Sequence, residues 1–238
     1  MPDLLPMDGH PNPNIPTRPV MLDRRLGHLA RRLAEHGPVK IACIGSSSTA
    51  GAYGVAPYPG RLEGLLRGQF FPIPIDVLNR GKGGEEAPDQ LERLKAVVTR
   101  EAPTIVIWQV GANAVFQGRD LGKVEEAIRS GLQSLADRPI DVILVDPQYL
   151  PPLLTMDRIK AALQMVSIIE NLASEMKVSV FRRFDFMRRI HRYERVSFDR
   201  MIVPEDWDRL HHNDWSTMRV TQALFDVMVH ALEAPAEA

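Results

Sequence analysis

Five short apolar runs alternate along the chain with segments in which apolar residues recur every three or four positions. The runs cover residues 39–45, 75–79, 104–110, 141–146 and 178–182. They are nearly continuous in Ile, Val and Leu, which predicts strands that are buried on both faces. Helical spacing appears between them at 61–69, 89–100, 124–136 and 157–176. Alternating strands and helices predict an α/β fold, with a parallel sheet covered by helices on both sides.

The two ends of the chain differ from this pattern. Residues 1–20 contain six prolines, which lack amide donors, and we expect an extended proline-rich arm. Leucines at helical spacing predict a surface helix over residues 21–35, and a last helix is expected over residues 215–232. Residues 233–238 form a tail of Pro, Ala and Glu. The 238 residues, 45% of them hydrophobic, suit one domain over residues 21–232.

The charge balance argues against several classes of partner. Lysine and arginine number 29 against 30 aspartates and glutamates, so no overall field attracts nucleic acid or anionic membranes. No apolar stretch is long enough to span a bilayer. The single cysteine, Cys43, allows no internal disulfide, and we expect it to fill the core. A soluble protein is expected, cytoplasmic as given and periplasmic or secreted if a signal peptide was removed; its oligomeric state is not predicted.

A cluster of small residues follows the first predicted strand. It reads Gly45-Ser46-Ser47-Ser48-Thr49-Ala50-Gly51. A serine at this position can be surrounded by backbone amides, as a nucleophile and its developing oxyanion require. Serine and threonine are also favoured at the starts of helices, so an ordinary helix-capping cluster is the alternative. The Gly-x-Ser-x-Gly elbow of α/β-hydrolases does not fit, because Thr49 stands at its second glycine.

A serine nucleophile needs a base, and the best candidate is His211. Asp208 precedes it by three residues, close enough for a carboxylate to orient the imidazole. A surface histidine in a polar loop is the plain alternative. His212 and Asp214 also permit a metal site, although no further ligand cluster accompanies them.

Two more turns rich in small residues follow strands. After the second strand comes Arg80-Gly81-Lys82-Gly83-Gly84-Glu85, and after the third comes Gly111-Ala112-Asn113-Ala114. Glycine lets the backbone approach a substrate closely, and an asparagine side chain offers a donor to an oxyanion. The glycine run lacks the spacing of a dinucleotide loop or a P-loop.

The order of these elements resembles the SGNH hydrolases, also called the GDSL family. The resemblance covers about residues 39–232 and implies a three-layer α/β/α sandwich with a mainly parallel five-stranded sheet, the flavodoxin-like fold of that family. It implies Ser47 as nucleophile, with Asp208 and His211 completing the triad. Gly84, in an Asn-x-Gly-x-x-Gly setting, and Asn113 would join the Ser47 amide in the oxyanion hole.

Three positions depart from the family pattern. Ser46 replaces the aspartate of the first block, Ala114 replaces the aspartate after the asparagine, and His212 stands where proline is common. None of these changes removes a catalytic group. The first two delete carboxylates that would brace loops, and Ser46 can take over part of that role.

The resemblance implies a serine esterase or acylhydrolase that works through an acyl-enzyme and requires no cofactor or metal. Short acyl esters, including acetyl groups on carbohydrate, are the expected substrates. Two alternatives stay open at this point. The same residues would serve an O-acyltransferase, and a carbohydrate-binding protein that retains the fold without catalysis would also tolerate the lost carboxylates.

Several weaker signals lie near these motifs. Residues 182–192 are basic with interleaved aromatics, and we interpret them mainly as the solvated face of a helix, with an anionic-substrate dock as the alternative. Trp108 is expected in the core. Trp207 and Trp215 flank the Asp208 loop and are candidates to line a pocket, with residues 201–207 as a mobile rim.

Overall fold

A central parallel sheet organises the computed structural model, which describes residues 20–233. The predicted arm and tail lie outside the described residues, apart from Val20 and Glu233. Five strands pair in the order β2-β1-β3-β4-β5. They are β1 (Val39–Gly45), β2 (Ile75–Gly81), β3 (Ile105–Gln109), β4 (Asp141–Val145) and β5 (Ser179–Phe181). Every pairing is parallel, so all the carboxyl ends lie at one edge.

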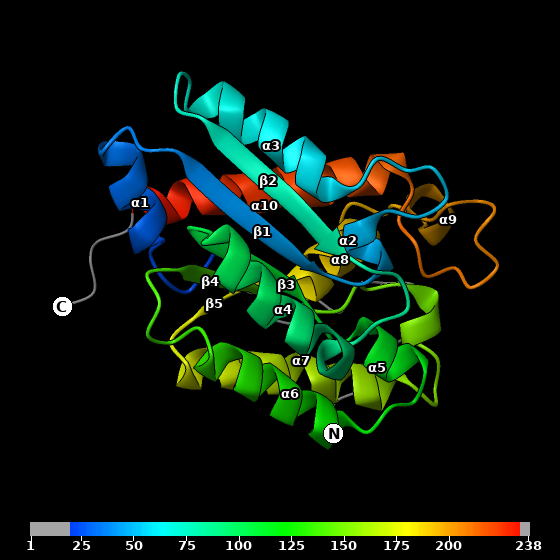
Figure 1. The fold of residues 1–238 in the computed structure, drawn as a ribbon. Coiled ribbons are helices and arrows are strands. Elements are labelled where there is room, and N and C mark those ends of the chain that lie inside the picture. The colour runs from blue at the N-terminus through cyan, green and yellow to red at the C-terminus, as the bar shows by residue number, and fades with distance from the viewer. Residues whose placement is uncertain (1–19, 234–238) are drawn as a thin grey trace.

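Helices cover both faces of this sheet (Figure 1). One layer holds α4 (Ala87–Glu101), α5 (Ala112–Phe116), α6 (Leu121–Gln133) and α7 (Ile159–Glu175). The other holds α1 (Gly27–Ala34), α3 (Tyr58–Gln69), α8 (Arg183–Arg192) and α10 (Asp214–Glu233). Short helices α2 (Ser47–Ala50) and α9 (Phe198–Met201) and the 3-10 turn η1 (Pro151–Leu153) complete the fold. The predicted α/β/α sandwich with a parallel sheet is therefore confirmed.

The main departure from the predicted elements is the first helix. Its pattern predicted a helix over residues 21–35, but α1 begins only at Gly27. Leu26 supplies part of the apolar spacing from outside the helix, because its side chain is buried in the core while its backbone is not helical. A buried leucine just before a helix can therefore continue the helical spacing in the sequence without being part of the helix.

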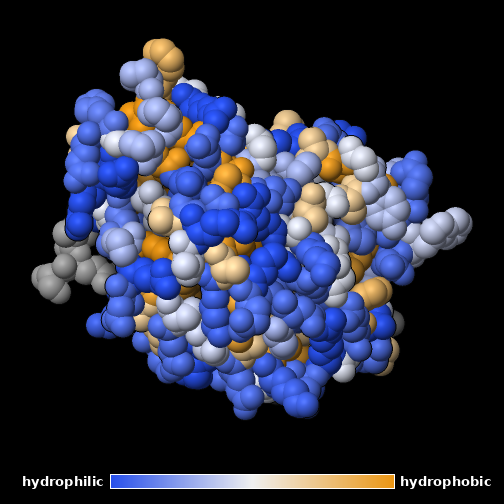
Figure 2. Space-filling model, viewed as in Figure 1, coloured by the Kyte–Doolittle hydropathy of each residue, from blue (hydrophilic) through white to orange (hydrophobic). Residues whose placement is uncertain are grey.

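The sheet forms the centre of one hydrophobic core. Every residue of β3 and β4 is buried, including Trp108, as their unbroken apolar runs predict. Cys43 is fully buried in β1, where burial raises the pKa of its thiol to about 12. The face seen in Figure 2 is largely hydrophilic, with apolar groups scattered in small areas. None of the helices described between residues 20 and 233 is long and apolar enough to cross a bilayer.

Candidate active site

Ser47 lies just beyond the carboxyl end of β1. The chain runs from β1 outward to β2 and then returns to pair β3 on the other side of β1, so β1 and β3 flank the point where the strand order reverses. Ligands of open α/β sheets bind at such a switch point. Ser47 opens the four-residue helix α2, whose N-cap is Ser46. Within residues 20–233 no acceptor takes the Ser47 amide, which leaves it available to a ligand.

The structure places His211 against Ser47, although 164 positions separate them in the sequence. His211 Nε2 lies 2.9 Å from Ser47 Oγ, within hydrogen-bond distance. His211 Nδ1 lies 2.9 Å from Asp206 Oδ2 on the opposite side of the ring. Serine, imidazole and carboxylate thus form one continuous chain of hydrogen bonds, the arrangement in which a histidine takes a hydroxyl proton.

Asp206 is held by hydrogen bonds from several directions. Its Oδ2 also accepts from the amides of Leu210 and His211, each at 2.7 Å, and its Oδ1 accepts from the Tyr53 hydroxyl at 3.0 Å. Burial alone works to raise the pKa of Asp206. The hydrogen bonds from His211 and Tyr53 outweigh burial and lower the pKa below its ordinary value. The carboxylate therefore stays ionised and faces the imidazole.

The structure corrects the predicted partner of His211. Asp208 is exposed to solvent, and the carboxylate that contacts the imidazole belongs to Asp206. The chain turns tightly between Asp206 and Arg209, where the Arg209 amide donates to the Asp206 carbonyl at 3.0 Å and Arg209 takes a left-handed conformation with φ of 53°. This turn directs the Asp206 carboxylate toward the amides of Leu210 and His211. Asp208 contributes its amide, which donates to Asp206 Oδ1 at 3.2 Å.

Tyr53 is a second residue that the sequence motifs did not indicate. Its ring centroid lies 5.3 Å from that of His211, and its hydroxyl holds Asp206. The hydrogen bond to Asp206 is the main reason that the pKa of Tyr53 is raised. About half of Tyr53 is exposed to solvent.

Gln109 takes over the bracing role at the first departure from the family pattern. Its Oε1 accepts hydrogen bonds from both the amide and the hydroxyl of Ser46, each at 2.9 Å. All of these groups are buried. Gln109 ends β3, so this contact ties the start of α2 to the neighbouring strand and fixes Ser47 in position.

The glycine-containing loop after β2 passes directly beside Ser47. Gly81 packs so tightly that a Cβ there would lie 2.3 Å from the amide nitrogen of Ala50, so only glycine fits. Asn79 joins the same two segments, since its side chain donates to Ala50 O and accepts from the Gly81 amide. A Cβ on Gly83 would lie 3.8 Å from Cβ of Ser47, which places this loop next to Ser47.

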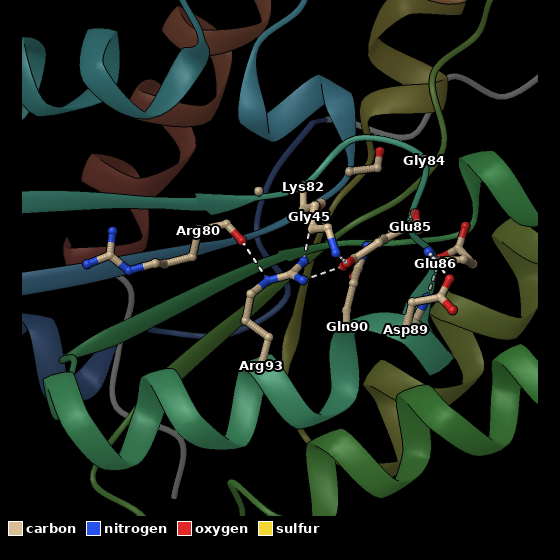
Figure 3. Close-up of polar contacts among 12 residues, drawn as sticks. Gly45, Arg80, Lys82, Gly84, Glu85, Glu86, Asp89, Gln90 and Arg93 are labelled. Atoms are coloured by element: carbon tan, nitrogen blue, oxygen red, sulfur yellow. Dashed lines mark hydrogen bonds and ion pairs between the residues drawn. The ribbon is translucent and has the colours of Figure 1, made fainter.

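Charged side chains fasten this loop to α4 (Figure 3). Arg93 pairs with Glu85 and donates to the carbonyl of Arg80 at 3.0 Å. Lys82 reaches the other oxygen of Glu85 at 3.0 Å. Gly84 lies between these anchored residues and has φ of 78°, a conformation that favours glycine.

Asn113 lies in α5, just after β3, and is buried. Its Nδ2 donates to the carbonyl of Glu85 at 2.9 Å, which uses one of the two amide hydrogens. Asn113 and the Gly84 loop are therefore held together at the carboxyl edge of the sheet, close to the Ser47 end of β1.

Glu86 provides the second brace, at the position where Ala114 lacks a carboxylate. Its two oxygens accept from the amides of Gly111 and Ala114, at 2.8 and 2.9 Å. Burial raises the pKa of Glu86 despite these bonds. A carboxylate from the loop before α4 thus orients the turn that carries Asn113.

We expect Glu86→Ala to lower the free energy of unfolding by about 3 kcal/mol or more, because two buried amides lose their acceptor. Urea unfolding monitored by circular dichroism measures this. Glu92→Ala, at an exposed glutamate of α4 paired with Lys95, is the matched control and should change stability by less than about 0.5 kcal/mol. Equal effects of the two substitutions would contradict the role assigned to Glu86.

A small cavity opens beside Ser47 and His211. Its volume is about 40 Å³, and it lies between α2, the start of α3 and the start of α10. Its walls combine apolar groups such as Val55 and Val220 with Arg183 and His212. A larger cavity of about 500 Å³ surrounds the amino ends of the strands, near Lys40 and Thr104, and does not include Ser47 or His211.

The weaker sequence signals have mixed outcomes. Trp207 is 97% exposed, and Trp215 lies between Arg200 and Arg219, so neither lines the small cavity. The predicted mobile rim is wrong for residues 201–203, which are buried in the core. The described residues contain no group of three or more His, Cys, Asp or Glu side chains able to hold a metal ion.

A parallel sheet of this order, with a serine and a histidine joined at its switch point, defines a protein with the SGNH hydrolase type of fold. The model of the Non-GDSL lipase-like family matches residues 13–233, and the chain belongs to that family. The resemblance to GDSL proteins therefore holds for the fold more closely than for the subfamily, in agreement with Ser46 in place of aspartate.

Solved structures support the same fold. A catalytic mutant of Axe2, an acetylxylan esterase from Geobacillus stearothermophilus, superposes with a TM-score of 0.70 at 19% identity, over 80% of this chain and 94% of that one. Axe2 without a named substitution superposes with a TM-score of 0.67 at 18% identity, over 84% of this chain and 97% of Axe2. TesA superposes with a TM-score of 0.64 at 19% identity, over 81% of this chain and 99% of TesA. No curated protein matches the chain significantly by sequence.

Proposed function

We propose that this protein is a serine esterase in which Ser47, His211 and Asp206 form the catalytic triad. The observation that carries the proposal is the pair of 2.9 Å contacts that join the three side chains. A core histidine without a catalytic role needs no such arrangement, in which one nitrogen faces a hydroxyl and the other a buried carboxylate. The position of Ser47 at the switch point supports the same proposal.

The reaction proceeds in two acyl-transfer steps. His211 Nε2 takes the Ser47 proton as Oγ attacks the ester carbonyl, and it returns that proton to the departing alcohol. Water then attacks the acyl-enzyme, with His211 again as base. Asp206 keeps Nδ1 protonated and stabilises the imidazolium that forms in each step.

Three donors are assigned to the oxyanion. They are the free amide of Ser47, the amide of Gly84 and the remaining Nδ2 hydrogen of Asn113. The Gly84 amide and the Asn113 side chain are held in place before substrate arrives. Asn113 donates to the carbonyl of Glu85, and Glu86 accepts from the amide of Gly111. Donors that are already in place need no reorganisation during the reaction, and for this reason they stabilise the transition state.

The substrate we assign is an ester with a short acyl group. The cavity of about 40 Å³ beside Ser47 has room for a few heavy atoms and not for a long chain. The likeness to Axe2 also favours small acyl groups, because Axe2 is described as an acetylxylan esterase and acetyl is a small acyl group. In that enzyme the alanine substitutions called catalytic are at an aspartate and a histidine three positions apart, as Asp208 and His211 are here. The geometry of this chain favours Asp206, and comparison of Asp206→Asn with Asp208→Asn distinguishes the two assignments.

A fluorophosphonate probe tests the proposal directly. Such probes modify serines whose hydroxyl is activated by a base, and peptide mass mapping identifies the labelled residue. We expect one label, on Ser47, together with release of p-nitrophenol from p-nitrophenyl acetate. An unlabelled Ser47 or a label on another serine would overturn the assignment of the nucleophile.

A further inference from the structure

Arg183 is a buried cation whose charge has no carboxylate within 4.0 Å in the described part of the chain. Arg183 is the first residue of α8, and only 3% of it is exposed. Its side chain nevertheless forms part of the wall of the Ser47 cavity. The guanidinium Nε donates to the carbonyl of Asp146 and Nη2 donates to Gln148 Oε1, each at 3.0 Å. Nη1 has no acceptor among residues 20–233.

Asp146, whose carbonyl accepts from Arg183, forms no ion pair with this charge through its side chain. Asp146 directs its Oδ1 to the amide of Phe184, while its Oδ2 has no hydrogen-bond partner in the described chain. Burial raises the pKa of Asp146 to about 8, so the group is mostly protonated at neutral pH. Burial lowers the pKa of Arg183 to about 10, which leaves the guanidinium charged there. A buried charge without a counter-ion is costly, and an anion in the cavity would offset that cost.

His212 provides a second unsatisfied group at the same cavity. Its Nε2 is shielded from solvent and has no hydrogen-bond partner within residues 20–233. Burial lowers the pKa of His212 to about 3, and the charges of Arg183 and His211 act in the same direction. The imidazole is therefore neutral and adds no charge to the wall of the cavity.

The cavity has the size of a small polar group. A site needs about 10–15 Å³ of such volume for one water, so 40 Å³ accommodates roughly three heavy atoms, as many as a carboxylate contains. Ser47 and His211 form part of the same wall. A group that occupies the cavity is thus within a few bonds of the reacting ester.

We propose that the Ser47 cavity binds a carboxylate carried by the ester substrate, held by the guanidinium of Arg183. The inference rests on the proposed esterase function and narrows it to acidic esters, such as a half ester of a short dicarboxylic acid. Nη1 of Arg183, which has no acceptor among residues 20–233, supplies the donor.

Binding is measured first, without catalysis, in the Ser47→Ala variant. Calorimetric titration compares monoethyl succinate with ethyl butyrate, which has the same acyl length and a methyl group in place of the carboxylate. We expect the acidic ester to bind about 10- to 100-fold more tightly, the range for hydrogen bonds to a charged group. The added substitution Arg183→Gln should abolish that preference. Arg189→Gln, at an exposed arginine of the same helix, should leave it unchanged.

Hydrolysis is measured next with the unmodified protein. The ratio of kcat/KM for monoethyl succinate over ethyl butyrate tests a carboxylate on the acyl side. The ratio for O-acetylglycolate over ethyl acetate, which has a methyl group in place of the carboxylate, tests one on the alcohol side. A ratio of about 10 or more for either pair supports the subsite, since charged hydrogen bonds have this magnitude.

Equal binding and equal hydrolysis of acidic and neutral esters by the unmodified protein would overturn the inference, whatever the stability of the Arg183 variants. A preference that Arg183→Gln leaves intact, in a variant whose circular dichroism shows a native fold, would overturn it as well. Selective binding of monoethyl succinate without hydrolysis of any ester would support the subsite and refute the esterase proposal. The two failures are therefore distinguishable.

Discussion

Ser47→Ala is expected to lower kcat for p-nitrophenyl acetate by on the order of 10⁴-fold or more, because no attacking oxygen remains. The donors assigned to the oxyanion, Gly84 and Asn113, would persist and account for any residual rate above that of water. KM should change little, since the serine hydroxyl contributes to bond formation more than to binding. Steady-state kinetics at several enzyme concentrations, with active-site titration of the unmodified protein, measures the effect.

The control for this substitution is Ser167→Ala. Ser167 is an exposed serine on α7 whose hydroxyl donates to the carbonyl of Leu163, away from the site. We expect its activity and melting temperature to match those of the unmodified protein. If Ser47→Ala retained more than about a tenth of the activity, the hydrolysis would come from another residue and the triad would be refuted.

The fold was predictable because burial on both faces leaves a clear trace in the residues of a strand. Runs such as residues 104–110 contain almost no polar side chain, and the two faces of β3 are covered as that composition requires. The position of Ser47 was predictable for a related reason, because the carboxyl ends of parallel strands meet at one edge and Ser47 comes just after β1. His211 lies beyond α8 and α9, so its contact with Ser47 was expected from the Asp-x-x-His resemblance and not from strand geometry.

The bracing residues were harder to recognise, because their function depends on contacts distant in sequence. Gln109 is the one strongly polar side chain in the run 104–110, a signal that marks it as a buried polar group with a partner. Glu86 and Asp89 form a capping box at the start of α4, which is local information. The bonds from Glu86 to Gly111 and Ala114 cross 25 and 28 positions and have no sequence signature.

Arg183 shows the same limit for charged residues. A basic run predicted a solvated helix face, yet Arg183, Met187 and Ile190 are all buried on α8. The spacing of four and seven positions to these apolar residues places Arg183 on the inward face. The helical position of each arginine therefore distinguishes buried Arg183 from exposed Arg189.

Asp206→Asn is expected to lower kcat by about 10³- to 10⁴-fold, because an amide side chain no longer holds Nδ1 of His211 in the protonated tautomer. Asp208→Asn should reduce kcat less than about threefold, since the carboxylate is exposed and only its amide contacts Asp206. Hydrolysis of p-nitrophenyl acetate by the two variants, compared at equal folded concentration, measures the difference.

This pair of variants also decides between loop geometry and motif spacing. Asp206 accepts hydrogen bonds from the amides of Leu210 and His211, so its substitution will also lower stability, and melting curves must confirm that the variant is folded during the assay. Activity lost with Asp208→Asn and kept with Asp206→Asn would mean that the loop closes differently during catalysis, with Asp208 as the carboxylate that faces His211. Loss with Asp206→Asn alone would show that the left-handed turn at Arg209 moved the acid two positions along the chain while the geometry around the imidazole stayed the same.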